Sequence, residues 1–240
     1  KMKIYIVTSN KYTHICPINV HFLNKYWPEQ EIVILGYEEV KKLTGLPSNV
    51  KVEYLGSQES FGKFWTNGLI PFFENIEDEY FTLIMEDFVL LNKVDVGEVK
   101  LLEDCFKFDS VDKAVIGGGI PLTQTSNFKP GVLLFNQHIP YRTTLHPSIW
   151  KKEYFLRYLK PNLSAWEFEM NNNQEASQDG ANIVALDYKY PGQKHLFSAL
   201  NLYSKGVLTI NAAADIIDNQ PSQRFWKKED IHFVWKQLRK

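Results

Sequence analysis

The chain has 240 residues, 44% hydrophobic and 23% charged, which suffices for the core of one sizeable α/β domain. A formal net charge of −1 argues against a nucleic-acid-binding protein, because such proteins normally carry a basic patch. Cys16 and Cys105 form neither a CxxC metal pair nor a disulfide framework. We find no apolar run of the ~18 residues that a membrane span needs and no signal peptide, so we expect a cytoplasmic protein.

Strands and helices are expected to alternate through the first hundred residues. β-prone runs at 3–7, 31–35 and 50–55 predict strands, and the segments 14–26, 40–43 and 64–75 predict the intervening helices. An apolar run from Tyr80 follows as a central strand that ends at Glu86 and Asp87. This alternation predicts βαβ units, a parallel sheet and a nucleotide-binding first half.

The second half is expected to continue the α/β pattern with weaker periodicity towards its end. The segments 113–116, 132–135, 142–146 and 183–186 predict strands, and 96–106, 148–159, 165–174 and 228–238 predict helices. No internal repeat and no low-complexity linker divides the sequence. We therefore expect a single domain over residues 1–240.

The adjacent carboxylates Glu86 and Asp87 are the strongest candidate site in the sequence. Ligands of an open α/β sheet bind outside the carboxyl ends of its strands, where these side chains are expected to lie. Two neighbouring negative charges in a partly dry crevice repel each other and are poorly solvated. A divalent cation that also holds a phosphate compensates for both effects. The alternative is a helix cap or a solvated turn.

The segment from Trp166 to Glu169 is a second candidate. On a helix, Glu167 and Glu169 point apart, so at most one of them faces a site. The alternative is a surface helix with a packed tryptophan. His146 precedes Pro147 at the end of a predicted strand, and a histidine in such a place is more often structural than a ligand.

Together these segments resemble the GT-A glycosyltransferases, and more narrowly a bacterial and viral group of nucleotide-sugar-dependent members. That group has a tryptophan-containing helix, an apolar strand that ends in acidic residues, a strand-Pro-x-x-Trp segment and a Trp-x-Phe-Glu motif, in this order. The corresponding segments here are Phe64-Trp65-Thr66-Asn67, Leu83-Ile84-Met85-Glu86-Asp87-Phe88, Thr144-Leu145-His146-Pro147-Ser148-Ile149-Trp150 and Trp166-Glu167-Phe168-Glu169.

The resemblance implies a GT-A fold, with a mostly parallel, Rossmann-like sheet flanked by helices. It divides the domain into a nucleotide-sugar-binding half at 1–110 and an acceptor-binding half at 111–240. The implied activity is that of a hexosyltransferase-type glycosyltransferase in polysaccharide biosynthesis. Such an enzyme moves a sugar from a nucleotide-sugar, here a UDP-sugar, to a hydroxyl of a saccharide or glycan acceptor, assisted by Mn²⁺ or Mg²⁺.

The resemblance also assigns site residues. Asp87, with Glu86 in part, is the metal ligand, and Met85 stands where the first acid of the family's Asp-x-Asp motif is usual. The catalytic base is Glu167 or Glu169. The acceptor contacts are His146, in a place where related chains often have glutamine, with Trp150 and Trp166 as stacking platforms. The nucleotide pocket comprises Thr8, Ser9, Asn10, Lys63, Trp65, Asn67 and Glu86, and the expected lid over the diphosphate carries Lys189, Lys194, His195 and Lys205.

Two alternatives to a glycosyltransferase stay open. A nucleotidyltransferase has a similar sheet and similar metal carboxylates, but usually begins with a glycine-rich loop after the first strand, and residues 8–13 contain no glycine. The altered acidic motif also allows a non-catalytic relative that binds a nucleotide or a glycan without turning it over.

Overall fold

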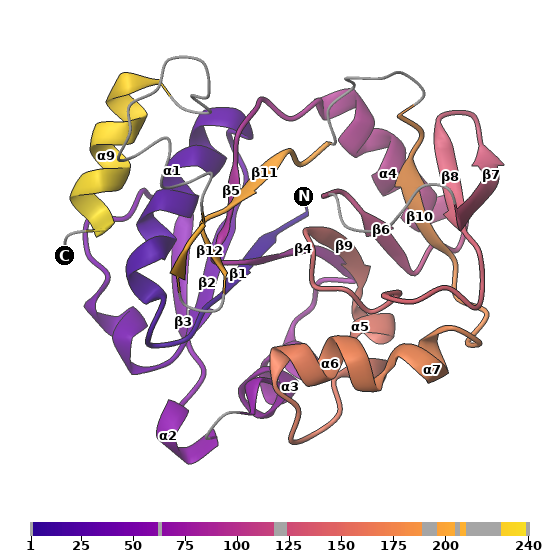
Figure 1. The fold of residues 1–240 in the computed structure, drawn as a ribbon, viewed down its shortest axis with the longest axis horizontal. Helices are drawn as coiled ribbons and strands as arrows, with labels where there is room; N and C mark the ends of the chain where they lie inside the picture. Colours follow the sequence, from indigo (N-terminus) through magenta and orange to yellow (C-terminus); the bar gives the residue numbers. More distant parts are fainter. Residues whose placement is uncertain are drawn as a thin grey trace.

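A computed structural model describes residues 2–61, 64–117, 124–188, 196–204, 207–209 and 227–238. Within these residues the chain forms a central sheet of nine strands, in the order β3-β2-β1-β4-β9-β6-β10-β8-β7 (Figure 1). β1 pairs in parallel with β2 and β4, β2 with β3, and β6 with β10. β9 and β8 are antiparallel to both of their neighbours, so the other seven strands share one direction. The predicted α/β fold with a mostly parallel sheet is confirmed.

The first half follows the predicted alternation closely. The central strand runs from Tyr80 to Met85 and ends at Glu86 and Asp87, as predicted, whereas the short strand that follows this turn was not predicted. The elements of this half are β1 (Ile4–Val7), η1 (Thr13–Ile15), α1 (Cys16–Tyr26), β2 (Ile32–Gly36), η2 (Glu38–Lys42), β3 (Val50–Tyr54), α2 (Gln58–Phe61), α3 (Trp65–Asn75), β4 (Tyr80–Met85), β5 (Phe88–Leu90) and α4 (Val96–Phe108).

The second half departs from the prediction around Pro147. The expected strand at 142–146 is irregular, because its buried polar side chains bond to other segments, and the strand instead occupies the start of the expected helix. A strand at 125–129 was not predicted. The elements are β6 (Lys113–Val115), β7 (Thr125–Lys129), β8 (Val132–Phe135), β9 (Ser148–Lys151), α5 (Lys152–Tyr158), α6 (Ala165–Asn171), α7 (Asn173–Ala176), β10 (Ile183–Leu186), β11 (Ala199–Asn201), β12 (Tyr203–Ser204), β13 (Val207–Leu208) and α9 (Lys228–Leu238).

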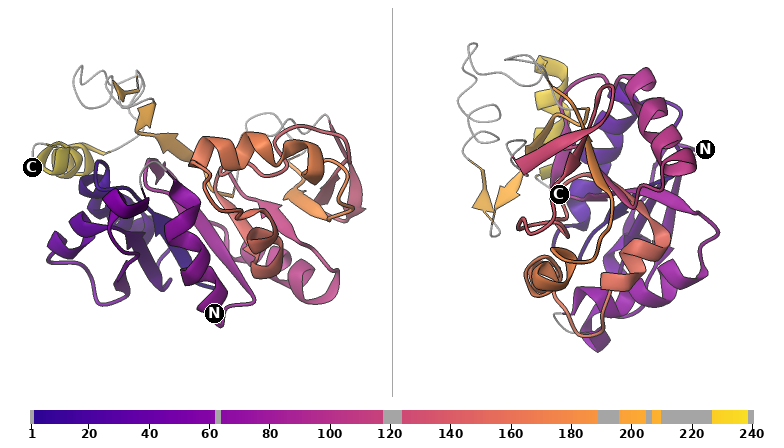
Figure 2. Two further views of the ribbon diagram at one scale, coloured as in Figure 1. Left: turned by 90° about the horizontal axis from the view of Figure 1, so that it is seen from below. Right: turned by 90° about the vertical axis from the view of Figure 1, so that its right-hand side faces the viewer.

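Helices cover both faces of the sheet (Figure 2). Successive strand residues point to opposite faces, so Ile4 and Ile6 pack in the core beneath α1, α4 and α9, whereas Tyr5 and Val7 pack in the core beneath α3, α5 and α6. All four β1 residues are buried, as expected for a strand covered on both faces. The carboxyl ends of β1 and β4 meet at one edge because Val7 pairs with Met85, and this edge carries the candidate site.

Candidate active site

The acidic turn, Glu86 and Asp87 between β4 and β5, lies beside the loop that follows β1. Glu86 N donates a hydrogen bond to Val7 O at 3.2 Å, and Thr8 N donates to Leu35 O on β2 at 2.9 Å. These bonds continue the parallel pairing one residue past the strand ends. The fold thereby brings Thr8 and Ser9 to the edge that carries the carboxylates, in agreement with what the resemblance to GT-A glycosyltransferases implies.

A cavity of about 240 Å³ opens at this edge. It brings together four of the predicted nucleotide-binding residues, Thr8, Ser9, Trp65 and Glu86. The carboxyl ends of β1, β2 and β4 and the start of α3 supply most of its wall. Residues that the sequence prediction did not include complete the lining: Tyr12, Tyr37, Gln58, Phe64, Met85 and Ala165. Tyr37 directly follows β2, and Gln58 begins α2 shortly after β3. Because ligands of open α/β sheets bind at the carboxyl ends of the strands, these two positions could have been predicted from the sequence.

Both carboxyl groups of the acidic turn are poorly solvated. Burial, reinforced by the neighbouring Asp87 charge, raises the pKa of Glu86 to about 8. Burial also raises the pKa of Asp87 to about 6. Glu86 is 6% exposed, and its Oε2 atom has no hydrogen-bond partner among the residues that the structure covers. A buried acceptor without a partner is costly, and a ligand that satisfies it recovers that cost.

The donor set of the acidic turn fits a hard divalent cation that is shared with a substrate. No group of three or more His, Cys, Asp or Glu residues capable of holding a metal occurs in the described part of the chain. Mg²⁺ sites typically use only one or two carboxylates together with substrate phosphates and water. Glu86 and Asp87 therefore suit a cation that binds with a phosphorylated ligand, and they do not form a complete protein-only site.

Trp65 contributes a second unsatisfied polar group to the cavity. Its indole Nε1 is buried and has no hydrogen-bond partner within the described ranges, while its ring packs edge-on against Phe168 at 5.4 Å between centroids. The prediction for Asn67 has less support, since its side chain exchanges hydrogen bonds with Asn162 and does not line the cavity. Lys63 lies outside the described residues.

Asn10 is tied into a network that holds the loops after β1, β2 and β3 together. Its Nδ2 donates to Glu38 at 2.7 Å, its Oδ1 accepts from Glu39 N, and its backbone N–H donates to Gln58. The hydrogen bond from Asn10, with others from Ser57 and from the backbone of Glu38 and Gln58, lowers the pKa of Glu38 to about 2, so its carboxylate stays ionised. In this arrangement Asn10 shapes the cavity wall through its neighbours and is not among the lining residues.

The two predicted base candidates occupy different positions on α6. Glu167 completes a capping box: its Oε2 accepts from Ser164 N at 2.8 Å and Ser164 Oγ at 2.7 Å. Glu169 points to the segment before His146, where its Oε1 accepts from Leu145 N at 2.6 Å and Thr144 Oγ1 at 3.1 Å. Their opposite directions agree with the expectation that at most one of them faces a site.

The predicted acceptor residues differ in accessibility. The Trp150 side chain is fully buried in β9, against Phe155 and Phe168, so it offers no face to a sugar and is a core residue. Trp166 is 67% exposed on α6 and keeps a free face. His146 lies with its ring 5.1 Å from that of Phe88, the residue that follows Asp87. The chain thus places His146 beside the acidic turn.

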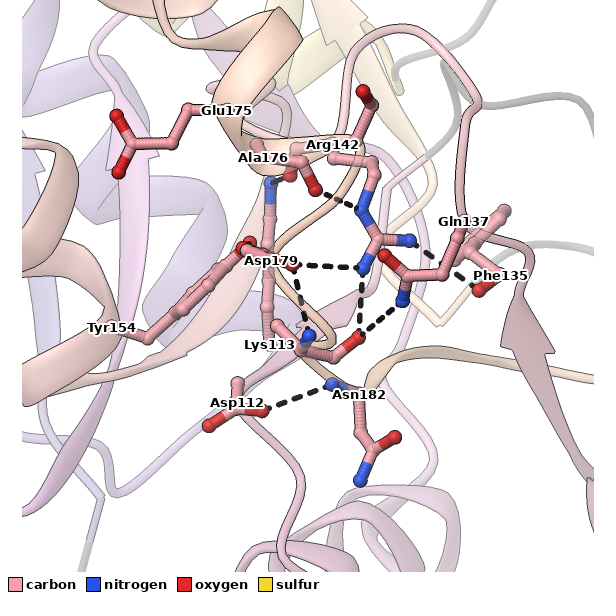
Figure 3. Close-up of polar contacts among 12 residues, drawn as sticks. Asp112, Lys113, Phe135, Gln137, Arg142, Tyr154, Glu175, Ala176, Asp179 and Asn182 are labelled. Atoms are coloured by element: carbon pink, nitrogen blue, oxygen red, sulfur yellow. Dashed lines mark hydrogen bonds and ion pairs between the residues drawn. The ribbon is translucent and has the colours of Figure 1, made fainter.

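A buried polar network supports the second half and was not predicted. Arg142 is fully buried, donates to Ala176 O and Ala181 O at 2.7 Å each, and forms an ion pair with Asp179 at 3.6 Å (Figure 3). Lys113 is also fully buried and donates to the carbonyls of Arg142 and Thr144. The burial lowers the pKa of Lys113 well below its usual range. Together with Glu169, these groups fix the irregular segment that leads to His146.

The expected lid falls outside the described residues, since it comprises Lys189, Lys194, His195 and Lys205. The membrane prediction is tested more directly, because none of the described helices combines the length and the apolarity that a membrane crossing requires.

No protein-family model and no curated protein matches this sequence. Among solved structures, S. aureus TarS is similar with 18% sequence identity and a TM-score of 0.53, over 79% of this chain and 35% of that one. A cytidylyltransferase from Leptospira borgpetersenii has 13% identity and a TM-score of 0.48, over 100% and 95% of the two chains. The galactosyltransferase LgtC has 14% identity and a TM-score of 0.43, over 77% and 72%. At 18% identity and a TM-score above 0.5, the likeness to TarS shows a shared fold and no more.

Proposed function

We propose that this protein is a metal-assisted glycosyltransferase that takes its sugar from a nucleotide-sugar, with a UDP-sugar as donor. One observation carries the proposal. Two residues that line the cavity at the carboxyl ends of β1 and β4 each carry a buried polar atom without a hydrogen-bond partner among the described residues, namely Glu86 Oε2 and the indole N–H of Trp65. A cation bound to a diphosphate matches both, because the cation satisfies the carboxylate and phosphate oxygens accept from N–H groups.

The acidic turn would hold the ion. Asp87 is the main proposed ligand and Glu86 the second, and Mn²⁺ or Mg²⁺ suits their oxygen donors. When bound, such an ion neutralises the charge that develops on the departing nucleoside diphosphate. The two carboxylates must ionise to bind it, so the raised pKa values of both groups predict weak binding at low pH.

The aromatic wall of the cavity suits the nucleoside of the donor. Tyr12 and Trp65 offer flat apolar surfaces, and Ser9 adds a hydroxyl group that can bond to a base or a ribose. Thr8 and Tyr37 also line the cavity, but both are buried and shape its wall. A cavity of mixed aromatic and polar lining is typical of small-molecule sites. This supports assignment of the β1 loop, with Trp65, to the nucleotide.

The acceptor would approach from the side of α6. We favour Glu169 over Glu167 as the base that accepts the proton of the acceptor hydroxyl, because Glu169 contacts the segment that carries His146 to the acidic turn. Glu167 is better explained as part of the helix cap. The exposed ring of Trp166 would stack on the acceptor sugar, with His146 as a further contact.

The experiment that tests this function measures UDP release from a panel of UDP-sugars with Mn²⁺, in the presence and absence of saccharide acceptors. Asp87→Ala should abolish both the release and the Mn²⁺-dependent binding of UDP in calorimetry. Asp104→Ala is the matched control, since Asp104 forms only a weak surface pair with Lys100 at 3.8 Å. Asp104→Ala should behave like the wild type.

The same experiment separates the alternatives. Formation of a nucleotide-sugar and pyrophosphate from UTP and a sugar 1-phosphate would instead show a nucleotidyltransferase. Thermal stabilisation by UDP and Mn²⁺ without turnover of any sugar nucleotide would show a binding protein. Unchanged binding of UDP and Mn²⁺ in Asp87→Ala would refute the role of the acidic turn.

A further inference from the structure

Asn19 is a fully buried polar residue on the apolar side of α1. Its neighbours one turn away on that helix face, Cys16, Phe22 and Leu23, belong to the core beneath the sheet. A buried amide is costly unless it forms hydrogen bonds, so an apolar residue of similar size would suit this core position better. The presence of an asparagine here needs a reason beyond packing.

The hydrogen bonds of Asn19 all go to the backbone around Asp87. Asn19 Nδ2 donates to Glu86 O at 3.2 Å and to Phe88 O at 2.9 Å. The single amide therefore bonds to the carbonyl on each side of Asp87. Both carbonyls lie where the β4 ladder has ended and β5 begins, so Asn19 fixes the peptide groups that set the directions of the Glu86 and Asp87 side chains.

Two backbone groups complete the attachment of the acidic turn. Glu86 N donates to Val7 O on β1, and Leu202 N, just after β11, donates to Asp87 O at 2.8 Å. Among the described residues that bond to the backbone of this turn, Asn19 alone uses its side chain, and it is therefore open to substitution. Asn19 Oδ1 is buried without a partner in the described part of the chain, so the amide is oriented by its two donated bonds.

Electrostatics explains why the acidic turn needs such an attachment. Its two carboxyl groups are adjacent and poorly solvated, so once both are ionised, as cation binding requires, they favour conformations that move them apart or towards water. A rigid backbone opposes this motion. Ligands that are held in place before the metal binds lose less freedom on binding, and the groups that orient them strongly affect metal affinity.

We propose that Asn19 is a positioning residue, which holds the backbone on both sides of Asp87 so that the two carboxylates are preorganised for a divalent cation. The metal part of this inference rests on the proposed function, whereas the attachment of the turn is independent of it. Asn19 does not line the cavity at the sheet edge, so its effect passes through the acidic turn.

The test uses Asn19→Leu, which keeps the branched shape and the number of heavy atoms and removes both donors, in the 240-residue chain. Asn24→Leu is the matched control, because Asn24 lies on the same helix and bonds through its side chain to Asn49, away from the acidic turn. Asn19→Ser, which adds no bulk, replaces Asn19→Leu if the latter does not fold. Circular dichroism and thermal unfolding confirm that each variant is folded.

Hydrogen exchange tests the attachment without any ligand. In both Asn19 variants, peptides that cover 84–90 and 199–204 should exchange roughly 10–100-fold faster, since two bonds to the turn are lost. Asn24→Leu should leave these peptides unchanged. Wild-type exchange at the turn in a folded Asn19 variant would overturn the proposal.

Calorimetric titration of Mn²⁺ in the presence of UDP tests the consequence for the cation. The Asn19 variants should bind Mn²⁺ about 10–100-fold more weakly, as is typical when a group that orients a ligand is removed. UDP-sugar turnover should recover towards the wild-type kcat at high Mn²⁺, whereas general damage to the fold would not be rescued by the metal. If the wild type binds neither Mn²⁺ nor UDP, the proposed function fails, and hydrogen exchange still decides the role of Asn19. If the Asn19 variants show faster hydrogen exchange at the acidic turn but bind Mn²⁺ with wild-type affinity, the proposal that Asn19 preorganises the carboxylates is wrong.

Discussion

Replacement of Glu86 by glutamine should stabilise the metal-free protein at alkaline pH. The folded protein holds the Glu86 carboxyl in a buried site with a pKa of about 8, compared with an ordinary value of 4.5 in the unfolded chain. Between these two values the folded state binds a proton that the unfolded state has released, so wild-type stability falls as the pH rises. Below pH 4.5 both states are protonated and the cost disappears.

The magnitude follows from the two pKa values. Each pH unit between them contributes about 1.4 kcal/mol, so ionisation of Glu86 costs the folded wild type roughly 3–5 kcal/mol at pH 8.5. The amide that Glu86→Gln introduces carries no charge at any pH and is close in shape to a protonated carboxyl group. The variant should therefore gain about 3–5 kcal/mol over the wild type between pH 4.5 and 8.5, a large part of the stability of an ordinary domain.

Urea denaturation in EDTA at pH 4.5, 6.5 and 8.5 measures this difference. Glu74→Gln on the exposed side of α3 is the control, and it should stay within about 0.5 kcal/mol of the wild type throughout. With UDP and Mn²⁺ the order should reverse, because the ligand stabilises the wild type and the variant lacks one carboxylate. A stability difference that does not change with pH would refute the reasoning, since it would mean that Glu86 does not ionise in a buried site.

Five further substitutions test the other assignments. Asp87→Asn should lose detectable Mn²⁺ binding by calorimetry with UDP present, and retained affinity would exclude Asp87 as a ligand. Glu169→Gln should lower turnover ~10²–10⁴-fold with donor binding intact. Glu167→Gln should keep near-wild-type turnover, because glutamine also completes a capping box. If Glu167→Gln is the slower variant, Glu167 is the base and Glu169 is structural. Trp166→Ala should raise the acceptor KM without lowering kcat, and an unchanged KM would remove the stacking role. Asp179→Ala should lower the free energy of unfolding by about 3–5 kcal/mol in urea, because it leaves the buried Arg142 guanidinium without its carboxylate and the Tyr154 and Tyr158 hydroxyls without their acceptor. A loss below about 1 kcal/mol would contradict this role of Asp179.

The fold was predictable where one physical signal dominated. Continuous apolar runs such as Ile4–Val7 identify strands that are covered on both faces, and their alternation with helices gives the parallel order of the first half. The position of the acidic turn followed from the same pattern, since a strand that ends in carboxylates places them at the sheet edge. Thr8, Ser9 and Trp65 met Glu86 there as expected.

The features that were not predicted depend on contacts between residues far apart in the sequence. Residues 142–146 include β-prone threonines, yet the buried Arg142 and its carbonyl partners hold this segment out of the sheet. Trp150 lies in a motif that suggests sugar stacking, and the antiparallel insertion of β9 buries it completely. Asn19 gave no local signal, because its two acceptors lie more than sixty residues away in the chain.

The position of β9 has a consequence for how substrates enter. This strand pairs with β4 of the first half and with β6 of the second, so its hydrogen bonds join the two halves into one continuous sheet. A hinge between the halves would have to break that ladder, so we expect no rigid-body opening of one half away from the other. Any movement that admits a ligand to the cavity would instead come from segments that lie outside the nine strands.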